Sequence, residues 1–430
     1  MGYHEVMKSK YFALNNLEIT IDRQGADRFQ KVSFPIRYGR FSEIKTPEYL
    51  LQFNLNGEIK YIRGLNGDWP HPAEWLKRTD ANDWVYYSAG EYNELFGLLG
   101  EYYRPCLPYP SNSIWKYNPF LDSGIQRALA SWPELITNFH TMLINGMPSK
   151  IKKYLLRISR QNAQVLHNRS EKLHGIIGGQ VTVLPPDTRH VDYEVIPLML
   201  TDGCLYHCDF CCIKSRQGFY LRSKENILQQ IRRLKRFYGA NLVNYNAIFL
   251  GNHDALAAGR ESICMSVDQS YTAFGFESSH IKNPSLFLFG SVDSLLNAGN
   301  CLIEALNQLP MYTYINIGLE SADEATLTQI NKPLEIQKIE SAFQMMLDVN
   351  RNYPNVEITA NTLLGDELRP EHYQSLIDLV HYGLDRFYSK GAIYLSPLMT
   401  SRNHRILLQK FSEIKKQSRL PTYLYLIQRL

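Results

Sequence analysis

The stretch from residue 194 to residue 396 alternates strand-like and helix-like segments, and this alternation restricts the possible folds more than any other feature of the chain. Strand-like patterns cover residues 194–200, 245–250, 286–290, 312–319, 356–363 and 391–396. Helix-like patterns cover residues 224–238, 293–308, 323–330, 335–350 and 370–382. This order predicts an α/β fold in which right-handed helical crossovers join the strands of a parallel sheet. In the first of these helices the pattern predicts a buried stripe of Ile227, Ile231, Leu234 and Tyr238.

The residues before this stretch follow a different pattern. Residues 50–62 predict a β-hairpin, with Asn56-Gly57 supplying the positive φ angles of its turn. Residues 123–172 predict helices, and the Gly and Pro residues of 175–187 predict a hinge. We therefore expect three parts, which are an N-terminal α+β domain at 1–185, a core at 186–400 and a C-terminal helical extension at 401–430.

The composition is that of a water-soluble globular protein. Of the 430 residues, 44% are hydrophobic and 20% are charged, so the chain can bury a core and has no bias toward disorder. The N-terminus lacks the apolar run of a signal peptide, and no later stretch has the apolar length needed to span a bilayer. These features predict a cytoplasmic protein with no membrane partner.

The net charge of +4 is mild and does not by itself call for a nucleic-acid partner. Two basic stretches, at 150–160 and 232–236, have a charge pattern that is typical of solvated helix faces. Binding to RNA stays open, but the charge pattern does not support it.

Four of the seven cysteines lie within nine residues, namely Cys204, Cys208, Cys211 and Cys212. Such clustering in a chain without a secretory signal predicts metal ligation rather than disulfide bonds. Cysteines spaced x3 and x2 on one loop can converge on a single metal centre. A structural zinc site needs four protein ligands, whereas three thiolates on a four-iron cluster leave one iron open for a ligand that is not protein.

This C-x3-C-x2-C motif directly follows the first predicted strand and has an aromatic residue, Phe210, before its last cysteine. In these features the chain resembles the radical S-adenosylmethionine superfamily. The resemblance implies a partial (β/α)6 barrel that holds one oxygen-sensitive [4Fe-4S] cluster on Cys204, Cys208 and Cys211, with Phe210 beside the cofactor. It also implies that the open iron chelates the amino and carboxylate groups of S-adenosyl-L-methionine. Reduction of the cluster then cleaves a carbon–sulfur bond, and the resulting 5′-deoxyadenosyl radical takes a hydrogen atom from a substrate.

Further candidates follow the second predicted strand, because ligands of parallel α/β folds bind beyond the carboxyl ends of the strands. This strand ends in Gly251-Asn252-His253-Asp254. The run is similar in place to the family's Gly-Gly-Glu element, which receives the amino group of the cofactor, but Asn252 and His253 replace the usual pair. The resemblance implies that Gly251, Asn252 and Asp254 contact the cofactor, although a plain turn explains Gly-Asn equally well.

The fourth predicted strand ends in Gly-Leu-Glu320-Ser321. This run resembles the coproporphyrinogen-oxidase-like and Elongator-like branch of the superfamily, in which the glutamate lies against the ribose or the methionine end of the cofactor. A carboxylate at position 320 can accept hydrogen bonds from an amine or from hydroxyl groups. Ser321 has a helix cap as its alternative role, and Gly365, after the fifth strand, either permits close approach to the adenine or marks a turn. The resemblance covers about residues 190–400.

Several questions stay open in the sequence. The remaining cysteines, Cys106, Cys264 and Cys301, are widely scattered in the sequence. We therefore expect one cluster and no second one. The candidate acid–base groups are His253, His280, Tyr394 and Asp366. The sequence does not rank them as catalytic residues, because a proton donor or acceptor must first lie within reach of the substrate. The N-terminal domain is hypothesised to cover the site, because a carbon radical needs a sealed cavity.

Two alternatives to the enzyme also remain. One is a zinc site completed by Cys212 or His207, and the other is a non-catalytic iron–sulfur sensor. For the enzyme, we expect an organic substrate that the sequence does not identify and a reductant such as flavodoxin or ferredoxin.

Overall fold

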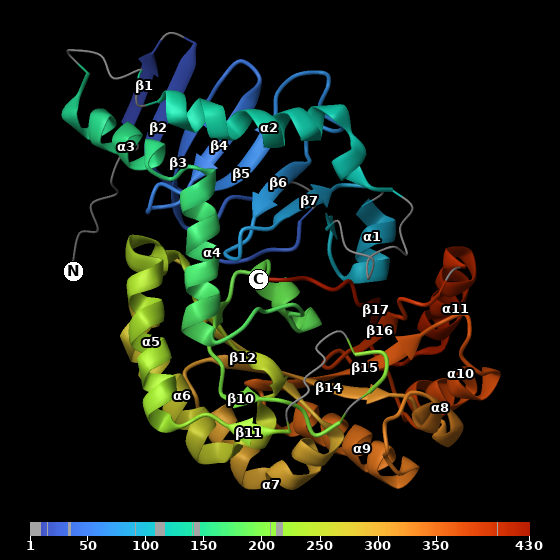
Figure 1. The fold of residues 1–430 in the computed structure, drawn as a ribbon. Helices are drawn as coiled ribbons and strands as arrows, with labels where there is room; N and C mark the ends of the chain where they lie inside the picture. The colour runs from blue at the N-terminus through green and yellow to red at the C-terminus, as the bar shows by residue number, and fades with distance from the viewer. Residues whose placement is uncertain are drawn as a thin grey trace.

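Two β-sheets dominate the chain. The computed structural model describes residues 10–14, 16–32, 36–90, 92–107, 117–139, 141, 147–206, 208–211, 218–401 and 403–430. An antiparallel sheet from the N-terminal part lies above a parallel sheet that is wrapped by helices, and α4 (Ala163–Ile177) runs between the two (Figure 1). The expected fold class, an α/β barrel preceded by an α+β domain, is confirmed.

The N-terminal sheet is an eight-stranded meander in which each strand pairs with the next one along the chain. Its strands are β1 (Lys10–Leu14), β2 (Leu17–Gln24), β3 (Arg40–Lys45), β4 (Tyr49–Phe53), β5 (Ile59–Gly64), β6 (Trp75–Arg78), β7 (Trp84–Ser88) and β8 (Arg104–Cys106). The helices of this part are α1 (Tyr92–Leu99), α2 (Ser123–Asn138) and α3 (Ser149–Ser159). Ile125 of α2 and Leu155 of α3 share one apolar cluster with the strands, so these helices cover one face of the sheet.

The hairpin predicted at 50–62 is formed by β4 and β5, but its turn differs from the expected one. Gly57 has φ +83°, whereas Asn56 is not among the residues with positive φ. The Gly57 amide donates to Asn54 O at 2.9 Å, and the Asn54 amide donates to Glu58 O at 2.9 Å. The loop is therefore one residue longer than a two-residue turn and needs glycine only at its last position.

The parallel sheet has the order β17-β16-β15-β14-β13-β12-β9. Its strands are β9 (Ile196–Pro197), β12 (Ala247–Asp254), β13 (Ser285–Gly290), β14 (Tyr312–Glu320), β15 (Val356–Leu364), β16 (Ile393–Pro397) and β17 (Thr422–Leu424). Its helices are α5 (Lys224–Tyr238), α6 (Gly259–Phe274), α7 (Val292–Asn307), α8 (Glu324–Gln329), α9 (Ile336–Asn352), α10 (Pro370–Ile377) and α11 (His404–Gln417). All of the pairings in this sheet are parallel, as crossover helices require.

Helix α5 begins and ends at the predicted residues and buries its predicted apolar stripe. Helix α6 was missed, because apart from Ile263, Val267 and Phe274 its buried positions are serines. A serine-lined helix face carries little hydrophobic signal even when it packs against a neighbouring helix.

The C-terminal region differs from the expected helical extension at 401–430. It contains α11, but it also supplies β17, which pairs with β16 and adds a strand to the sheet. Beyond β17, the amide of Leu184 donates to Gln428 O at 2.9 Å, and Tyr425 Oη donates to Leu184 O at 2.6 Å. The Gly- and Pro-containing segment expected to be a hinge is thus bonded to residues 425–430.

The N-terminal sheet contacts the barrel where β12 and β13 begin. Asn244 Oδ1, just before β12, accepts from the Arg40 amide at 2.7 Å. Before β13, the Lys282 amide donates to Asp27 O at 2.6 Å. A short 3₁₀ helix, η3 (Pro186–Val191), also packs against β13 and β14. These contacts join the two parts at the amino ends of the parallel strands.

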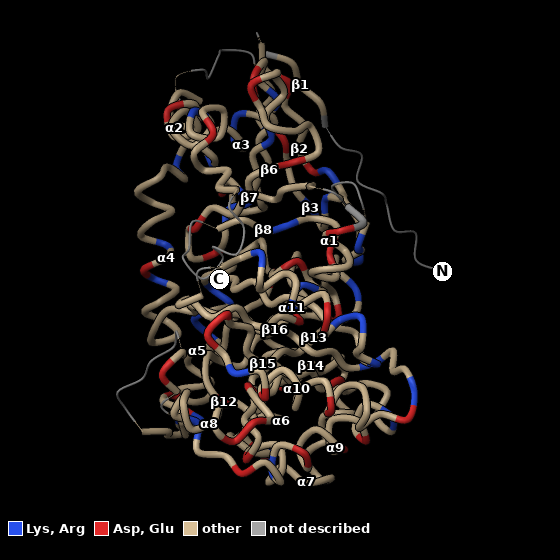
Figure 2. Tube along the Cα trace, turned by 90° about the vertical axis from the view of Figure 1, so that its right-hand side faces the viewer, with Lys and Arg blue, Asp and Glu red and all other residues tan. Residues whose placement is uncertain are grey.

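In a view turned by 90°, basic and acidic residues are interspersed along both parts of the molecule (Figure 2). Within the described residues, no helix combines the length and the apolar character that a membrane crossing requires.

Candidate functional site

A pocket of about 420 Å³ lies at the carboxyl ends of the parallel strands. The strands β12, β13, β14, β15 and β16 each contribute lining residues from their last positions. This volume lies in the usual range for small-molecule sites. Of the residues named in advance, Cys204, Cys208, Phe210, Cys211, Asn252, Asp254 and Glu320 line the pocket, and Gly251 does not.

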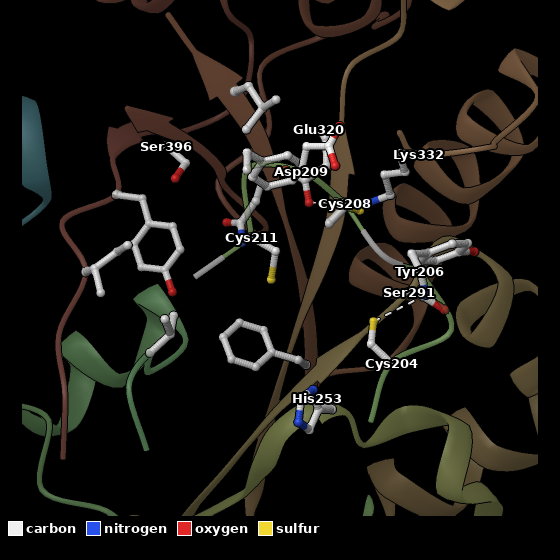
Figure 3. A pocket seen from close by; sticks show the side chains of 18 of the residues that line it. Cys204, Tyr206, Cys208, Asp209, Cys211, His253, Ser291, Glu320, Lys332 and Ser396 are labelled. Atoms are coloured by element: carbon white, nitrogen blue, oxygen red, sulfur yellow. Dashed lines mark hydrogen bonds and ion pairs between the residues drawn. The ribbon is translucent and has the colours of Figure 1, made fainter. Parts of the chain in front are cut away.

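The three cysteines come from one excursion of the chain between two short paired strands, β10 (Thr201–Asp202) and β11 (Tyr220–Leu221). Their side chains border the same cavity (Figure 3). Among the described residues, no group of three His, Cys, Asp or Glu side chains is suited to hold a single metal ion. Cys212 and His207 lie outside the described residues.

The base of this excursion is fastened by Arg222. Its guanidinium donates to both carboxylate oxygens of Asp202 at 2.5 Å and to Ile177 O, at the end of α4, at 2.6 Å. A two-oxygen arginine–carboxylate pair fixes geometry as well as charge. Arg222 therefore ties the start and the end of the cysteine excursion together and anchors both to α4.

Tyr206 fastens the excursion near the pocket. Its hydroxyl donates to the carboxylate of Asp293, which also accepts from Lys338 Nζ at 2.8 Å. The ring lies under Lys332 Nζ, which is 5.5 Å from its centroid, and the Tyr206 amide donates to Cys204 Sγ at 3.4 Å. Burial, followed by the hydrogen bond to Asp293, raises the pKa of Tyr206, so the hydroxyl stays protonated at neutral pH.

The Cys208 thiol is partly shielded from solvent. Burial raises its pKa to about 11, and the positive charge of Lys332 acts in the opposite direction. Metal binding displaces the thiol proton, so iron would have to compete with it.

The end of β12 presents two polar side chains with unused capacity. Asn252 Nδ2 donates to Gln180 O at 2.6 Å, but Asn252 Oδ1 and Asp254 Oδ2 are buried without a hydrogen-bond partner. Burial raises the pKa of Asp254, and the nearby Ser291 and Ser294 hydroxyl groups and the Ala257 amide, which donates to Asp254 Oδ1 at 3.2 Å, oppose that rise. Two unpartnered acceptors at the pocket suit a ligand that donates hydrogen bonds.

Glu320 stands at a strained turn where β14 ends. It has φ +66°, and the Ser321 amide donates to Leu319 O at 2.9 Å across it. This combination of a positive φ and a three-residue hydrogen bond is the rare form of the γ-turn. Lys332 Nζ stabilises the turn by donating to Gly318 O at 2.6 Å and to Glu320 Oε1 at 3.3 Å.

Ser321 holds the other side of this turn. Its hydroxyl lies 2.8 Å from His372 Nδ1, while His372 Nε2 lies 3.0 Å from Leu363 O. Since a carbonyl oxygen only accepts, Nε2 carries the proton and Nδ1 accepts from Ser321. Ser321 also accepts from the Asp323 amide at 3.0 Å, but the N-cap of α8 is Asp323, whose carboxylate accepts from the Thr326 amide.

Tyr206, Lys332 and His372 were not found from the sequence. The Lys332 signal was the run Leu-Thr-Gln-Ile-Asn-Lys-Pro after the Glu320 strand, whose lysine reaches back across a turn. Of the unranked acid–base candidates, His253 lines the pocket. Tyr394 instead donates to buried Asp187 at 2.7 Å, inside the barrel.

An apolar part of the pocket lining comes from outside the barrel strands. It includes Val183, Leu398, Met399, Tyr425 and Ile427. Among the described residues, Val183 is the earliest in the chain that lines the pocket, so no described strand of the N-terminal sheet contributes to the lining. Val183 lies near the end of the expected N-terminal domain at 1–185, and a lid formed by that domain stays a prediction.

Comparison with known proteins gives one family match. The model of the radical SAM superfamily matches residues 198–380, which include all three cysteines, Asp254 and Glu320. This match supports an enzyme. A search of curated proteins finds no match.

Solved structures with a similar arrangement include a radical SAM methyltransferase from Sphaerobacter thermophilus, at 14% identity and a TM-score of 0.39 over 54% of this chain. The chain spans 65% of that structure's length. SuiB from Streptococcus suis bound to S-adenosylmethionine is 10% identical with a TM-score of 0.36, covering 81% of this chain and 71% of SuiB. Methylornithine synthase is 12% identical with a TM-score of 0.33, covering 73% of this chain and 78% of that one. At these values the similarity carries no functional detail.

Proposed function

We propose that this chain, whose residues 198–380 match the radical SAM superfamily, cleaves S-adenosyl-L-methionine reductively and uses the product radical to take hydrogen from an organic substrate. The observation that carries the proposal is the convergence of three loop cysteines and the Glu320 turn on one pocket inside the matched segment. The Gly-Leu-Glu-Ser run at 318–321 supports the coproporphyrinogen-oxidase-like and Elongator-like branch.

The residues at the pocket fit an iron–sulfur cluster. Cys204, Cys208 and Cys211 would hold it, and each thiolate would bind a different iron, so the three sulfurs need not meet at one point. When bound and reduced, a [4Fe-4S] cluster supplies the electron that splits S-adenosyl-L-methionine into methionine and a 5′-deoxyadenosyl radical. That electron must come from a donor such as flavodoxin or ferredoxin.

The protein's own groups would bind and orient the second cofactor. The buried acceptors Asn252 Oδ1 and Asp254 Oδ2 suit its ammonium group, and Glu320 suits its ammonium or its ribose hydroxyls. Phe210 offers a ring beside the last cysteine. Gly251, outside the pocket lining, has φ +89° and would act by shaping the end of β12.

The proposal is tested by anaerobic reconstitution with iron and sulfide, reduction with dithionite, and an assay for 5′-deoxyadenosine. We expect release that depends on S-adenosyl-L-methionine and disappears in Cys208→Ala. Cys264→Ala is the matched control, because Cys264 lies on α6 away from the pocket lining. A protein that takes up zinc but no iron, and releases no 5′-deoxyadenosine, would contradict the proposal.

A non-catalytic iron–sulfur sensor is the second candidate function. It shares the cysteine loop but has no use for a strained carboxylate poised beside it, so the Glu320 turn favours the enzyme. Iron uptake without any 5′-deoxyadenosine under the same conditions would favour the sensor.

A further inference from the structure

A narrow cleft lies between the N-terminal sheet and the barrel, and it shares no lining residue with the pocket that the cysteines border. Its volume is about 60 Å³. The lining includes Arg37 and Arg40 from the sheet part and Asn241, Asn244 and Tyr245 from the barrel part. The family match begins at residue 198, and the pocket of the proposed function contains none of these residues.

The guanidinium of Arg37 has an unusual environment in this cleft. It lies over the rings of Tyr61 and Trp75, 5.2 Å from each centroid. Its Nη1 atom is buried without a hydrogen-bond partner, and no hydrogen bond or ion pair joins the side chain to any described residue. A guanidinium has five N–H donors, so this group keeps a large unused capacity for an acceptor.

Other buried cations at the same seam do have carboxylate partners. Lys60 Nζ lies 2.9 Å from Glu194 and 3.3 Å from Asp80. Lys77 Nζ lies 2.8 Å from Glu194 and 3.2 Å from Asp192. Proteins normally pair the charges that they bury, so Arg37 departs from the rule that its neighbours follow.

The protonation energetics show the same contrast. Burial lowers the pKa of Arg37 to about 10, because nearby groups do not compensate for the lost solvation. Burial also acts to lower the pKa of Lys77, but Asp192 and Glu194 more than offset it and the pKa lies above its usual value. Glu194 also lines the cleft, but it pairs with Lys60 and Lys77 rather than with Arg37.

A second hollow of about 110 Å³ lies beside the first, and both are lined by Phe29, Tyr38 and Tyr61. Trp75 lines the second hollow, and its Nε1 is another buried donor without a partner. Two unused donors, an unpaired positive charge and aromatic walls together suit a ligand that brings oxygen acceptors and negative charge.

We propose that this seam is a binding site for a small oxyanion, a carboxylate or a phosphate group, which Arg37 receives in the cleft. The site is separate from the proposed radical chemistry and does not depend on a cluster. The neighbouring hollow would hold the remainder of a ligand larger than the anionic group itself.

The test uses the full chain with no iron added. Trifluoroacetate is the probe, and the chloride concentration is held constant. We expect saturable broadening of the ¹⁹F signal, which displacement by acetate or by inorganic phosphate reverses. Displacement by acetate indicates a carboxylate site, and displacement by phosphate indicates a phosphate site. No saturable broadening in the native chain would mean that the cleft holds only water, and it would overturn the proposal.

Variants locate the binding. Loss of a charged hydrogen bond in Arg37→Gln should weaken probe binding by about tenfold or more. Arg127→Gln is the control, because Arg127 lies on α2 and its side chain is 55% exposed. If Arg37→Gln fails to fold by circular dichroism, Arg37→Lys keeps the charge but loses the planar fork, and weaker binding is again expected. The proposal is overturned if a folded Arg37→Gln binds the probe as tightly as the native chain. Where Arg37→Gln does not fold, native-like binding by Arg37→Lys overturns it.

Discussion

Glu320 and Lys332 depend on one another. The positive φ of Glu320 is costly for a residue with a side chain, and Lys332 offsets that cost by binding both the carbonyl of Gly318 and the carboxylate. A Cβ at position 318 would overlap the same carboxylate, which explains the glycine. The orientation of Glu320 thus belongs to a small network of side chains rather than to one residue.

Replacing Lys332 with Met should weaken the binding of S-adenosyl-L-methionine. Loss of a charge-assisted hydrogen bond costs about 1.5–3 kcal/mol, which corresponds to roughly a tenfold to hundredfold higher Kd. Equilibrium dialysis of S-adenosyl-L-methionine against the reconstituted protein measures this Kd. Lys235→Met, at an exposed position on α5, is the control, and an equal loss in both variants would contradict this account.

Tyr206→Phe removes the hydroxyl that bonds to Asp293 and leaves the ring under Lys332. We expect faster loss of iron to a chelator, since the cysteine excursion loses one of its fastenings, with little change in global unfolding. Asp293→Asn keeps an acceptor for the hydroxyl and should behave like the native protein. Tyr382→Phe, at a tyrosine that is 71% exposed and outside the cysteine excursion, is the control, and unchanged iron retention in Tyr206→Phe would exclude this fastening.

At the scale of elements, strand positions were predictable from apolar runs, because buried parallel strands are apolar on both faces. β13 and β14 agree with prediction within a residue or two at each end. The side chains that complete the site were less predictable, because Lys332 and His372 reach Glu320 and Ser321 only through tertiary packing. A single sequence records neither the reach of a lysine across a turn nor the tautomer of a buried histidine.

The helix η3 places a carboxyl group inside the barrel. Asp187 accepts from Thr359 Oγ1 at 2.6 Å and from Tyr394 Oη at 2.7 Å. Burial raises its pKa to about 6 despite these hydrogen bonds. Between about pH 4 and pH 6 the carboxyl group of Asp187 is protonated in the native state and ionised in the unfolded chain. The free energy of unfolding therefore falls as the pH rises through this range.

Asp187→Asn should remove that pH-dependent contribution. The native protein should lose about 3 kcal/mol of unfolding free energy relative to the variant between pH 4 and pH 7. Urea denaturation of both proteins at several pH values measures the difference. A difference that does not change with pH would show that Asp187 keeps an ordinary pKa.

At the scale of the whole molecule, the two parts of the chain are joined at several places. The N-terminal sheet contacts the amino ends of the strands, and the pocket lies at the carboxyl ends. Residues 425–430 bond to the segment before β9 and also reach the sheet, since the Ala81 amide donates to Leu430 O at 3.2 Å. The same residues supply Tyr425 and Ile427 to the pocket wall.

Deletion of residues 425–430 should therefore destabilise the whole protein. Tyr425, Leu426 and Leu430 are all buried, and their removal should cost about 5 kcal/mol of unfolding free energy. The urea midpoint measures this loss, with Tyr382→Ala as the control because that tyrosine is 71% exposed. An unchanged midpoint would show that the tail only rests on the surface.

The bond between Tyr425 and Leu184 joins residues 241 positions apart. During synthesis, the segment at 181–184 must wait for its partner until almost the entire barrel has left the ribosome. Contacts of such long range form slowly, because the entropy of closing the loop is lost before the contact is gained. The pocket wall should thus be among the last parts of the molecule to assemble, and a nascent chain halted before residue 425 would present an incomplete pocket.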